Sequence, residues 1–178
     1  MAMQTIFAAA ALLDDGWAKD VLVGVDDDGR IASVARDVKP APDSAKVETL
    51  LPAACNLHSH TFQRAMAGLT ERRGPSERDS FWTWREVMYR FLDLLLPGDI
   101  EAIAAFAFME MQEAGFAAVA EFHYLHNQPG GAAYDDRGEL SARIGAAQAT
   151  TGIGLTLLPV YYAQGGVDGR ALAGGQLR

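Results

Sequence analysis

The feature that most constrains the fold is a regular alternation of strand-like and helix-like segments after residue 50. Short apolar runs alternate with longer amphipathic stretches, many of them bounded by Gly or Pro. The predicted order is strand, helix, helix, strand, helix, strand, over Leu50–Leu57, 81–96, Asp99–Ala114, 116–122, Glu139–Thr151 and 153–160. Because such alternation with apolar strands is typical of parallel βαβ units, the sequence predicts an α/β fold. The run Leu50–Leu57 is apolar almost throughout, which predicts a strand buried on both faces.

Local signals mark the ends of the predicted helices. Ser80 precedes the first helix, where a hydroxyl can cap a free backbone N–H group. Gly115 and Gly152 follow the second and third helices, and glycine readily takes the left-handed conformation that ends a helix. These signals support the predicted boundaries.

Residues 1–50 have a different pattern, which predicts β structure. The apolar runs Val21–Val25 and Ile31–Val34 flank an Asp-Gly pair, a strong hairpin signal. The opening stretch MAMQTIFAAAALLDDGW lacks the basic residues that begin a signal peptide, so it is interpreted as a strand and turn. Residues 38–50 contain two prolines and are interpreted as a connection. We therefore predict a β-rich segment over residues 1–50 and an α/β region over residues 51–178.

Composition excludes several classes of protein. Hydrophobic residues make up 49% of the 178 residues and charged residues 21%, which indicates a globular core rather than disorder. The formal charge of −8 argues against a nucleic-acid partner, but not against a small anionic substrate held by local arginines. No apolar run in the sequence reaches the roughly 18–20 residues of a membrane helix. A single cysteine, Cys55, suits a reducing compartment, so we expect a cytoplasmic protein with no membrane partner.

Two of the four histidines, His58 and His60, follow the first predicted strand of the α/β region. Residues i and i+2 of a strand project to the same face. The carboxyl ends of parallel strands are where α/β sheets and barrels place their sites, and imidazole is a good Zn²⁺ ligand. The pair is therefore a candidate half of a metal site; two solvated loop histidines would give the same pattern.

Gln63 and Arg85 are candidate ligand-binding residues at the same edge. Gln63 lies shortly after the histidine pair, where a loop folding over the strand end could aim it at a ligand. Arg85 lies near the start of a predicted helix and opposes the helix dipole, so we expect it to have a partner. A carboxylate held through two hydrogen bonds is the natural one, and a surface salt bridge is the alternative.

The stretch EFHYLHN at residues 121–127 ends the next predicted strand. In an extended strand Glu121 and His123 share one face, and Phe122 and Tyr124 share the other. Tyr124 could offer its hydroxyl to a substrate or could be a packing tyrosine. His123 is interpreted as a hydrogen-bonded polar residue rather than a ligand, and His126 as exposed.

The segments NLHSHTFQRAMAGL, DSFWTWREVMYR, AGFAAVAEFHYLH and GIGLTLLPVYY together resemble the formimidoylglutamate deiminases of the amidohydrolase superfamily, from about Leu51 to Tyr162. The resemblance implies a (β/α)₈ TIM-type barrel preceded by a small β-sandwich domain. It implies one Zn²⁺ per full-length chain, or another divalent metal, with His58 and His60 as two of its ligands. It also implies that Gln63, Arg85 and Tyr124 bind the substrate, the last two near its carboxylates.

The activity that this resemblance implies is hydrolysis of N-formimino-L-glutamate to N-formyl-L-glutamate and ammonia, a step of histidine degradation. The expected partner is a small anionic substrate, and a homodimer of the full-length enzyme is a further expectation. The general acid/base and the remaining zinc ligands of the family are expected beyond Arg178.

The sequence departs from the family pattern in two respects. Ala53 stands where the family usually has glycine. More importantly, a (β/α)₈ barrel takes about 250 residues, whereas residues 51–178 hold three predicted barrel strands. We therefore expect the N-terminal portion of such an enzyme, with the first three βα units of the barrel. The 178-residue chain alone is expected to be inactive and poorly stable, with exposed apolar edges.

Other interpretations stay open at this point. Another amidohydrolase deaminase could act on a heterocyclic or guanidine-type substrate, which would not need a carboxylate clamp. A non-catalytic truncated paralogue would share the histidine pair without the activity. The simplest alternative is an α/β domain with incidental histidines.

Overall fold

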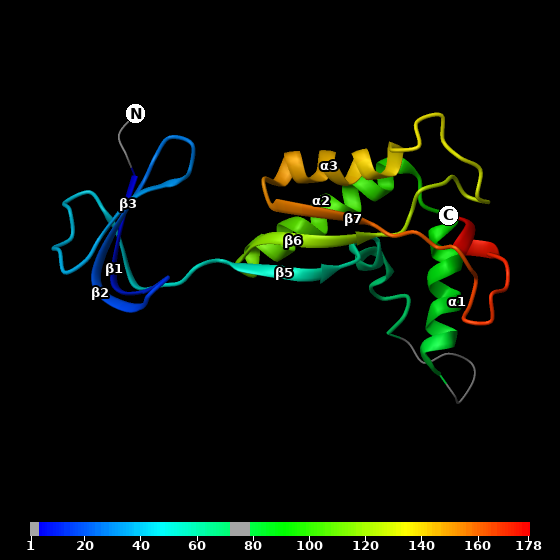
Figure 1. The fold of residues 1–178 in the computed structure, drawn as a ribbon, viewed down its shortest axis with the longest axis horizontal. Coiled ribbons are helices and arrows are strands. Elements are labelled where there is room, and N and C mark those ends of the chain that lie inside the picture. Colours follow the sequence, from blue (N-terminus) through cyan, green and yellow to red (C-terminus); the bar gives the residue numbers. More distant parts are fainter. Residues whose placement is uncertain (1–3, 72–78) are drawn as a thin grey trace. The chain divides into compact units, whose positions relative to one another are not determined.

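The computed structural model describes residues 4–71 and 79–178, and the chain divides into two compact units, Met1–Ala53 and Ala54–Arg178. Figure 1 shows a β-only first unit and a second unit of mixed helices and strands. None of the helices in the described ranges is long and apolar enough to cross a membrane.

The first unit is a four-stranded sheet in the order β3-β2-β1-β4. Its strands are β1 (Gln4–Leu13), β2 (Gly16–Val25), β3 (Ile31–Ala35) and β4 (Ala45–Leu50). β2 pairs antiparallel with both β1 and β3, and β4 pairs parallel with β1. Small and β-branched side chains form its buried core: Ala8, Ala11, Ala18, Val21 and Val23.

The predicted hairpin is confirmed, and one predicted connection is wrong. β2 and β3 flank a turn in which the Asp26 carboxylate accepts hydrogen bonds from the backbone N–H groups of Asp28 and Arg30. Residues 45–50, expected to belong to a connection, form β4 instead. Ala45 and Val47 alternate with Lys46 and Glu48, but this alternation is short and follows two prolines closely. The backbone ladder with β1 makes the segment a strand.

The second unit confirms the predicted α/β class. Its three strands are β5 (Ala54–Ser59), β6 (Phe116–His123) and β7 (Gly154–Pro159), which pair in parallel in the order β5-β6-β7. Three α-helices accompany them: α1 (Phe81–Leu92), α2 (Pro97–Glu113) and α3 (Glu139–Thr151). Short 3₁₀ helices lie at η1 (Thr61–Met66) and η2 (Gly174–Leu177).

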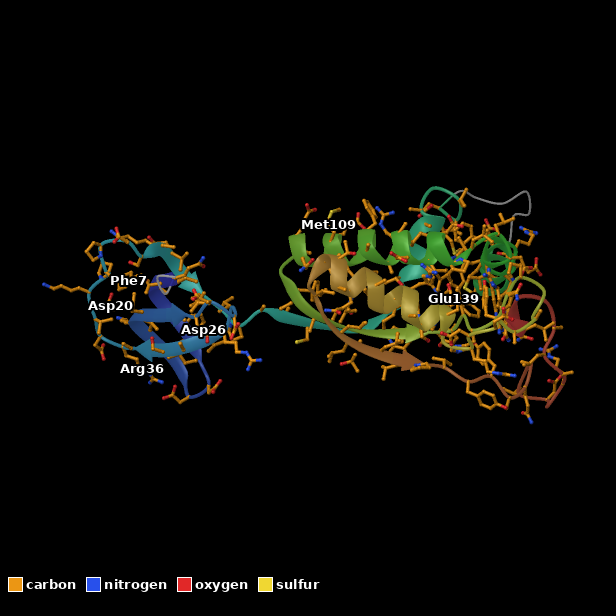
Figure 2. The ribbon with its side chains drawn as sticks, turned by 90° about the horizontal axis from the view of Figure 1, so that it is seen from above. Phe7, Asp20, Asp26, Arg36, Met109 and Glu139 are labelled. Carbon is orange, nitrogen blue, oxygen red and sulfur yellow. The ribbon has the colours of Figure 1, made fainter. Side chains whose placement is uncertain are left out.

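Helices α2 and α3 lie beside each other and pack on the sheet. Figure 2 shows the two helices side by side, with Met109 labelled on α2 and Glu139 on α3. The apolar core lies between these helices and the strands and includes Ile100, Ala104, Phe108, Val119, Leu140, Ile144 and Ala147. Helix α1 lies near the carboxyl ends of the strands (Figure 1). Helices α2 and α3 therefore leave that end of the sheet to α1 and to the loops, which carry the candidate residues.

Two predicted segments differ from the structure. The strand expected over Leu50–Leu57 lies at Ala54–Ser59, and its expected burial on both faces is wrong, because Leu57 is 77% exposed. Among the described strands β5 pairs only with β6 and lies at the edge of the sheet. The first helix ends at Leu92 rather than at residue 96, because Pro97 opens α2 and the residue before a proline avoids helical geometry.

Two glycines of α3 provide a matched test of this architecture. Gly152 ends the helix with φ +76, where a side chain is strained, whereas Gly145 lies in the helix interior with open space beside it. We expect Gly152→Ala to lower the free energy of unfolding by about 1 kcal/mol and Gly145→Ala to raise it by about 0.5–1 kcal/mol. Urea denaturation measures both; equal effects of the same sign would contradict the assigned end of α3.

Candidate functional site

A pocket of about 460 Å³ lies at the carboxyl ends of β5 and β6 and brings together four of the predicted site residues. His60, Gln63, Arg85 and Tyr124 all line it. The rest of its wall is largely aromatic and apolar, and includes Phe62, Trp84, Met88, Tyr89, Leu92 and Tyr162. A few polar groups that converge in an apolar wall are typical of a small-molecule site.

The fifth predicted residue, His58, joins the site through His60. The two Nε2 atoms lie 3.0 Å apart, and the imidazole rings meet edge to face. Two nitrogen ligands of one tetrahedral zinc ion lie about 3.3 Å apart, given Zn–N bonds of about 2.0–2.1 Å. The pair therefore converges in the manner required of two ligands of one metal ion.

The other ring nitrogen of His60 fixes its tautomer. Nδ1 lies 3.1 Å from the backbone carbonyl oxygen of Phe122. A carbonyl can only accept a hydrogen bond, so Nδ1 carries the proton and Nε2 keeps its lone pair. Histidine metal ligands characteristically donate their second N–H group to such an acceptor. Within the described ranges no third His, Cys, Asp or Glu joins the pair to complete a metal-binding group.

Arg85 is held toward the pocket by neighbours on its own helix. Its Nε donates a hydrogen bond of 2.9 Å to the Tyr89 hydroxyl, and its guanidinium lies 5.1 Å from the centre of the Tyr89 ring and 5.8 Å from that of Trp82. The hydrogen-bond partner of Arg85 in this structure is thus the neutral hydroxyl of Tyr89, and the expected carboxylate partner stays a prediction. Such stacking orients a planar guanidinium, so the side chain presents a positive charge to the pocket.

Gln63 and Tyr124 line the same pocket as His60. The Gln63 amide contacts the Met88 sulfur at 3.8 Å. The Tyr124 ring packs edge to face on His60, with 5.1 Å between ring centroids, and also contacts Tyr162 at 5.5 Å. Tyr89 and Tyr162 are pocket residues that the sequence reasoning missed. The i, i+4 spacing of Tyr89 from Arg85 and the position of Tyr162 just after a strand were the available signals.

On the opposite face of β6, Glu121 and His123 are almost fully buried, 1% and 3% exposed. The predicted division of β6 into two faces is therefore confirmed. Glu121 Oε1 accepts hydrogen bonds from the backbone N–H group and the hydroxyl of Thr61, at 2.7 and 2.9 Å. Burial raises the pKa of the Glu121 carboxyl, while its hydrogen bonds with Ser59 and Thr61 act in the opposite direction.

The interpretation of one of two further histidines needs correction. His123 was expected to be hydrogen-bonded, and it has a backbone hydrogen bond with Leu125, although its buried Nε2 has no partner among the described residues. His126 was expected to be exposed, but it is half-buried, and its Nε2 lies 2.8 Å from the carbonyl oxygen of Val160. The loop after β6 folds back beside the end of β7, which a strand pattern alone does not reveal.

Comparison with known proteins identifies relatives of this chain. Residues 3–46 match the sequence family described as formimidoylglutamate deiminase HutF, N-terminal domain. The whole chain is 48% identical over 176 residues to a formimidoylglutamate deiminase of Pseudomonas aeruginosa. The chain is similar to the N-terminal part of formimidoylglutamate deiminases. This similarity confirms the resemblance inferred from the sequence.

Solved structures show the same fold. A crystal structure of an amidohydrolase from Brucella melitensis has 48% sequence identity and a TM-score of 0.90, covering 98% of this chain and 39% of that one. An atrazine chlorohydrolase from Arthrobacter aurescens, complexed with zinc, has a TM-score of 0.70 at 19% identity, over 98% of this chain and 41% of that one. The chain thus spans about 39% of the length of the Pseudomonas aeruginosa relative.

The buried His123 predicts a loss of stability in acid. Burial, followed by the nearby His126, lowers the pKa of His123 from 6.5 to about 4. An unfolded chain binds a proton as the pH falls through 6.5, while the folded chain does not, so this contribution to stability is complete above pH 6.5 and is lost toward pH 4. Between pH 7 and pH 4 we expect a loss of about 3 kcal/mol in the free energy of unfolding.

Urea denaturation at both pH values, on the wild type and on His123→Leu, isolates this contribution. The variant should lose about 3 kcal/mol less than the wild type over the same interval. An identical pH dependence of the two proteins would contradict the burial of a neutral His123.

Proposed function

We propose that this chain is the N-terminal part of a zinc-dependent hydrolase that converts N-formimino-L-glutamate to N-formyl-L-glutamate and ammonia. The observation that carries the proposal is the convergence of a histidine pair, an arginine and a tyrosine on one pocket. The relative from Pseudomonas aeruginosa, a formimidoylglutamate deiminase at 48% identity, supports the choice of reaction. The zinc complex of the more distant atrazine chlorohydrolase supports the choice of metal.

The residues of this chain fit the metal half of such a site. His58 and His60 would hold the ion through their Nε2 atoms, with Phe122 keeping the proton of His60 on Nδ1. When bound, a zinc ion would supply hydroxide near neutral pH by lowering the pKa of a bound water to about 7. Zn²⁺ is proposed on the donor set, since imidazole nitrogen also suits several other divalent transition metals.

The same pocket fits a small dianion. Arg85 presents a guanidinium suited to a carboxylate, and the hydroxyl of Tyr124 and the amide of Gln63 can donate further hydrogen bonds. The aromatic and apolar wall excludes water and so strengthens the attraction between the guanidinium and an anion. Because the whole chain has a net charge of −8, the arginine in the pocket is a local exception, and it supports an anionic substrate.

Catalysis is proposed to need more than residues 1–178. The described residues supply two imidazoles, whereas a catalytic zinc ion usually has three protein ligands. The matching relative is more than twice as long as this chain. We therefore propose that residues 1–178, as a separate chain, bind neither metal nor substrate tightly enough for turnover.

A chimera tests this proposal. Residues 1–178 would replace the matching residues of the Pseudomonas aeruginosa relative, and ammonia release from N-formimino-L-glutamate would be measured. We expect turnover by the chimera within about tenfold of that relative, and none by residues 1–178 alone, because only the chimera has a complete ligand set. A folded chimera without turnover, or turnover by the separate chain near that of the relative, would contradict the proposal.

The role of Arg85 can be tested in the same chimera. A charged hydrogen-bond pair contributes about 1.5–3 kcal/mol, so Arg85→Met should raise KM about 10- to 100-fold. Arg90→Met, an exposed arginine of the same helix, should leave KM unchanged. A KM unaffected by Arg85→Met, together with turnover of a neutral heterocyclic substrate, would favour the alternative deaminase.

A further inference from the structure

Among the described residues, Glu121 is the one acidic side chain that is buried at the candidate site, and none of the proposed roles uses it. It is 1% exposed, although it lies one residue before Phe122, whose carbonyl holds His60. Burying a carboxylate costs free energy unless hydrogen bonds compensate. The contacts of Glu121 therefore indicate why the chain carries an acid there.

Those contacts all go to the residues on either side of His60. Oε1 accepts hydrogen bonds from the N–H group of Thr61 at 2.7 Å and from its hydroxyl at 2.9 Å. Ser59 lies close enough to the carboxyl group to lower its pKa, while Oε2 has no hydrogen-bond partner among the described residues. The carboxylate thus contacts the residue before His60 and the residue after it.

The backbone at this point needs such support. The pairing of β5 with β6 shifts register between Ala54 and Cys55 and again between Asn56 and Ser59, and Ser59 pairs with Glu121. Thr61 opens the 3₁₀ helix η1, so its N–H group has no partner within that helix. The Glu121 carboxylate supplies the acceptor that neither the strand ladder nor the helix provides.

The hydrogen bond between the His60 ring and Phe122 depends on this support. The Phe122 carbonyl is fixed within β6, which pairs with β7 at Leu158. The ring of His60 can meet that carbonyl at 3.1 Å only while the backbone of residues 59–61 stays in place. Two neighbouring residues of β6 therefore hold this segment. Glu121 accepts hydrogen bonds from Thr61, and the Phe122 carbonyl holds the ring of His60.

We propose that Glu121 is a positioning residue, which fixes residues 59–61 so that His60 keeps its proton on Nδ1 and directs its Nε2 toward a metal ion. This inference rests on the metal site proposed above. Glu121 does not contact the metal or the substrate; it acts through His60. A purely packing role would leave the His60 tautomer and the metal affinity unchanged when Glu121 is replaced.

The test uses the full 178-residue chain, with two readouts. Long-range ¹H–¹⁵N spectra report which ring nitrogen of His60 carries the proton, with the signals assigned by comparison with His60→Gln. Calorimetric titration with Zn²⁺ alone reports metal affinity. Glu121→Leu removes the acceptor, and Glu121→Gln keeps an oxygen that can accept both bonds from Thr61. Val119→Ala, buried on the same face of β6, controls for a general loss of stability.

We expect Glu121→Leu to populate both His60 tautomers and to raise the Kd for Zn²⁺ at least about tenfold, as the loss of supporting hydrogen bonds around metal ligands typically does. Glu121→Gln should restore both readouts to near wild type, and Val119→Ala should lower only the melting temperature. If Glu121→Leu matches Val119→Ala in tautomer and Kd, the proposal is overturned.

Two further outcomes are decided by the same design. If Glu121→Leu does not fold, Thr61→Val, which loses one of the two bonds, should shift the tautomer in the same direction to a smaller extent; no shift overturns the proposal. If the wild-type chain binds Zn²⁺ too weakly for calorimetry, the same variants are titrated in the chimera described above, which has a complete ligand set. Equal Kd values for the wild type and Glu121→Leu in the chimera overturn the proposal, and the tautomer measurement decides the role of Glu121 independently.

Discussion

The parallel pairing of β5 with β6 is the constraint on which the candidate site depends. Because both strands run in the same direction, the residues that follow them emerge at one edge of the sheet. That edge places His60 within hydrogen-bonding distance of Phe122 and packs its ring on Tyr124. Helix α1 lies near the same end and contributes Arg85 to the pocket. The site is thus a consequence of strand direction: the strand ends contribute His60 and Tyr124, and helix α1 contributes Arg85.

Strand β6 serves the site and the core at once. Its alternating faces direct Phe122 and Tyr124 to the histidine side and bury Glu121 and His123 on the other. Polar residues on the buried face are costly, and for both of them the cost is met only in part. Oε1 of Glu121 accepts two hydrogen bonds from Thr61, but its Oε2 and the Nε2 atom of His123 have no partner within the described chain. Burial lowers the pKa of His123 to about 4, so this residue stays neutral near pH 7.

The order of the α/β elements and the end of α3 at Gly152 could be predicted from the sequence, because apolar periodicity and glycine signals are local. The parallel sheet followed from the same pattern. β4 was missed because its apolar alternation is short and follows two prolines closely, and the ladder with β1 defines it as a strand. The contact of Arg85 with Tyr89 and the hold of Glu121 on Thr61 depend on side-chain placement that no spacing rule specifies. The histidine pair could be identified from the sequence. The tautomer of His60 could not, because it depends on the position of the Phe122 carbonyl.

The central claim is that His58 and His60 act together as ligands of one metal ion. X-ray absorption at the zinc edge, on the chimera loaded with Zn²⁺, tests it most directly. The account predicts imidazole nitrogens at about 2.0–2.1 Å from the zinc, with the imidazole signal reduced in His58→Ala and again in the double variant His58→Ala/His60→Ala. A spectrum with the same imidazole signal in the wild type and the double variant would contradict it.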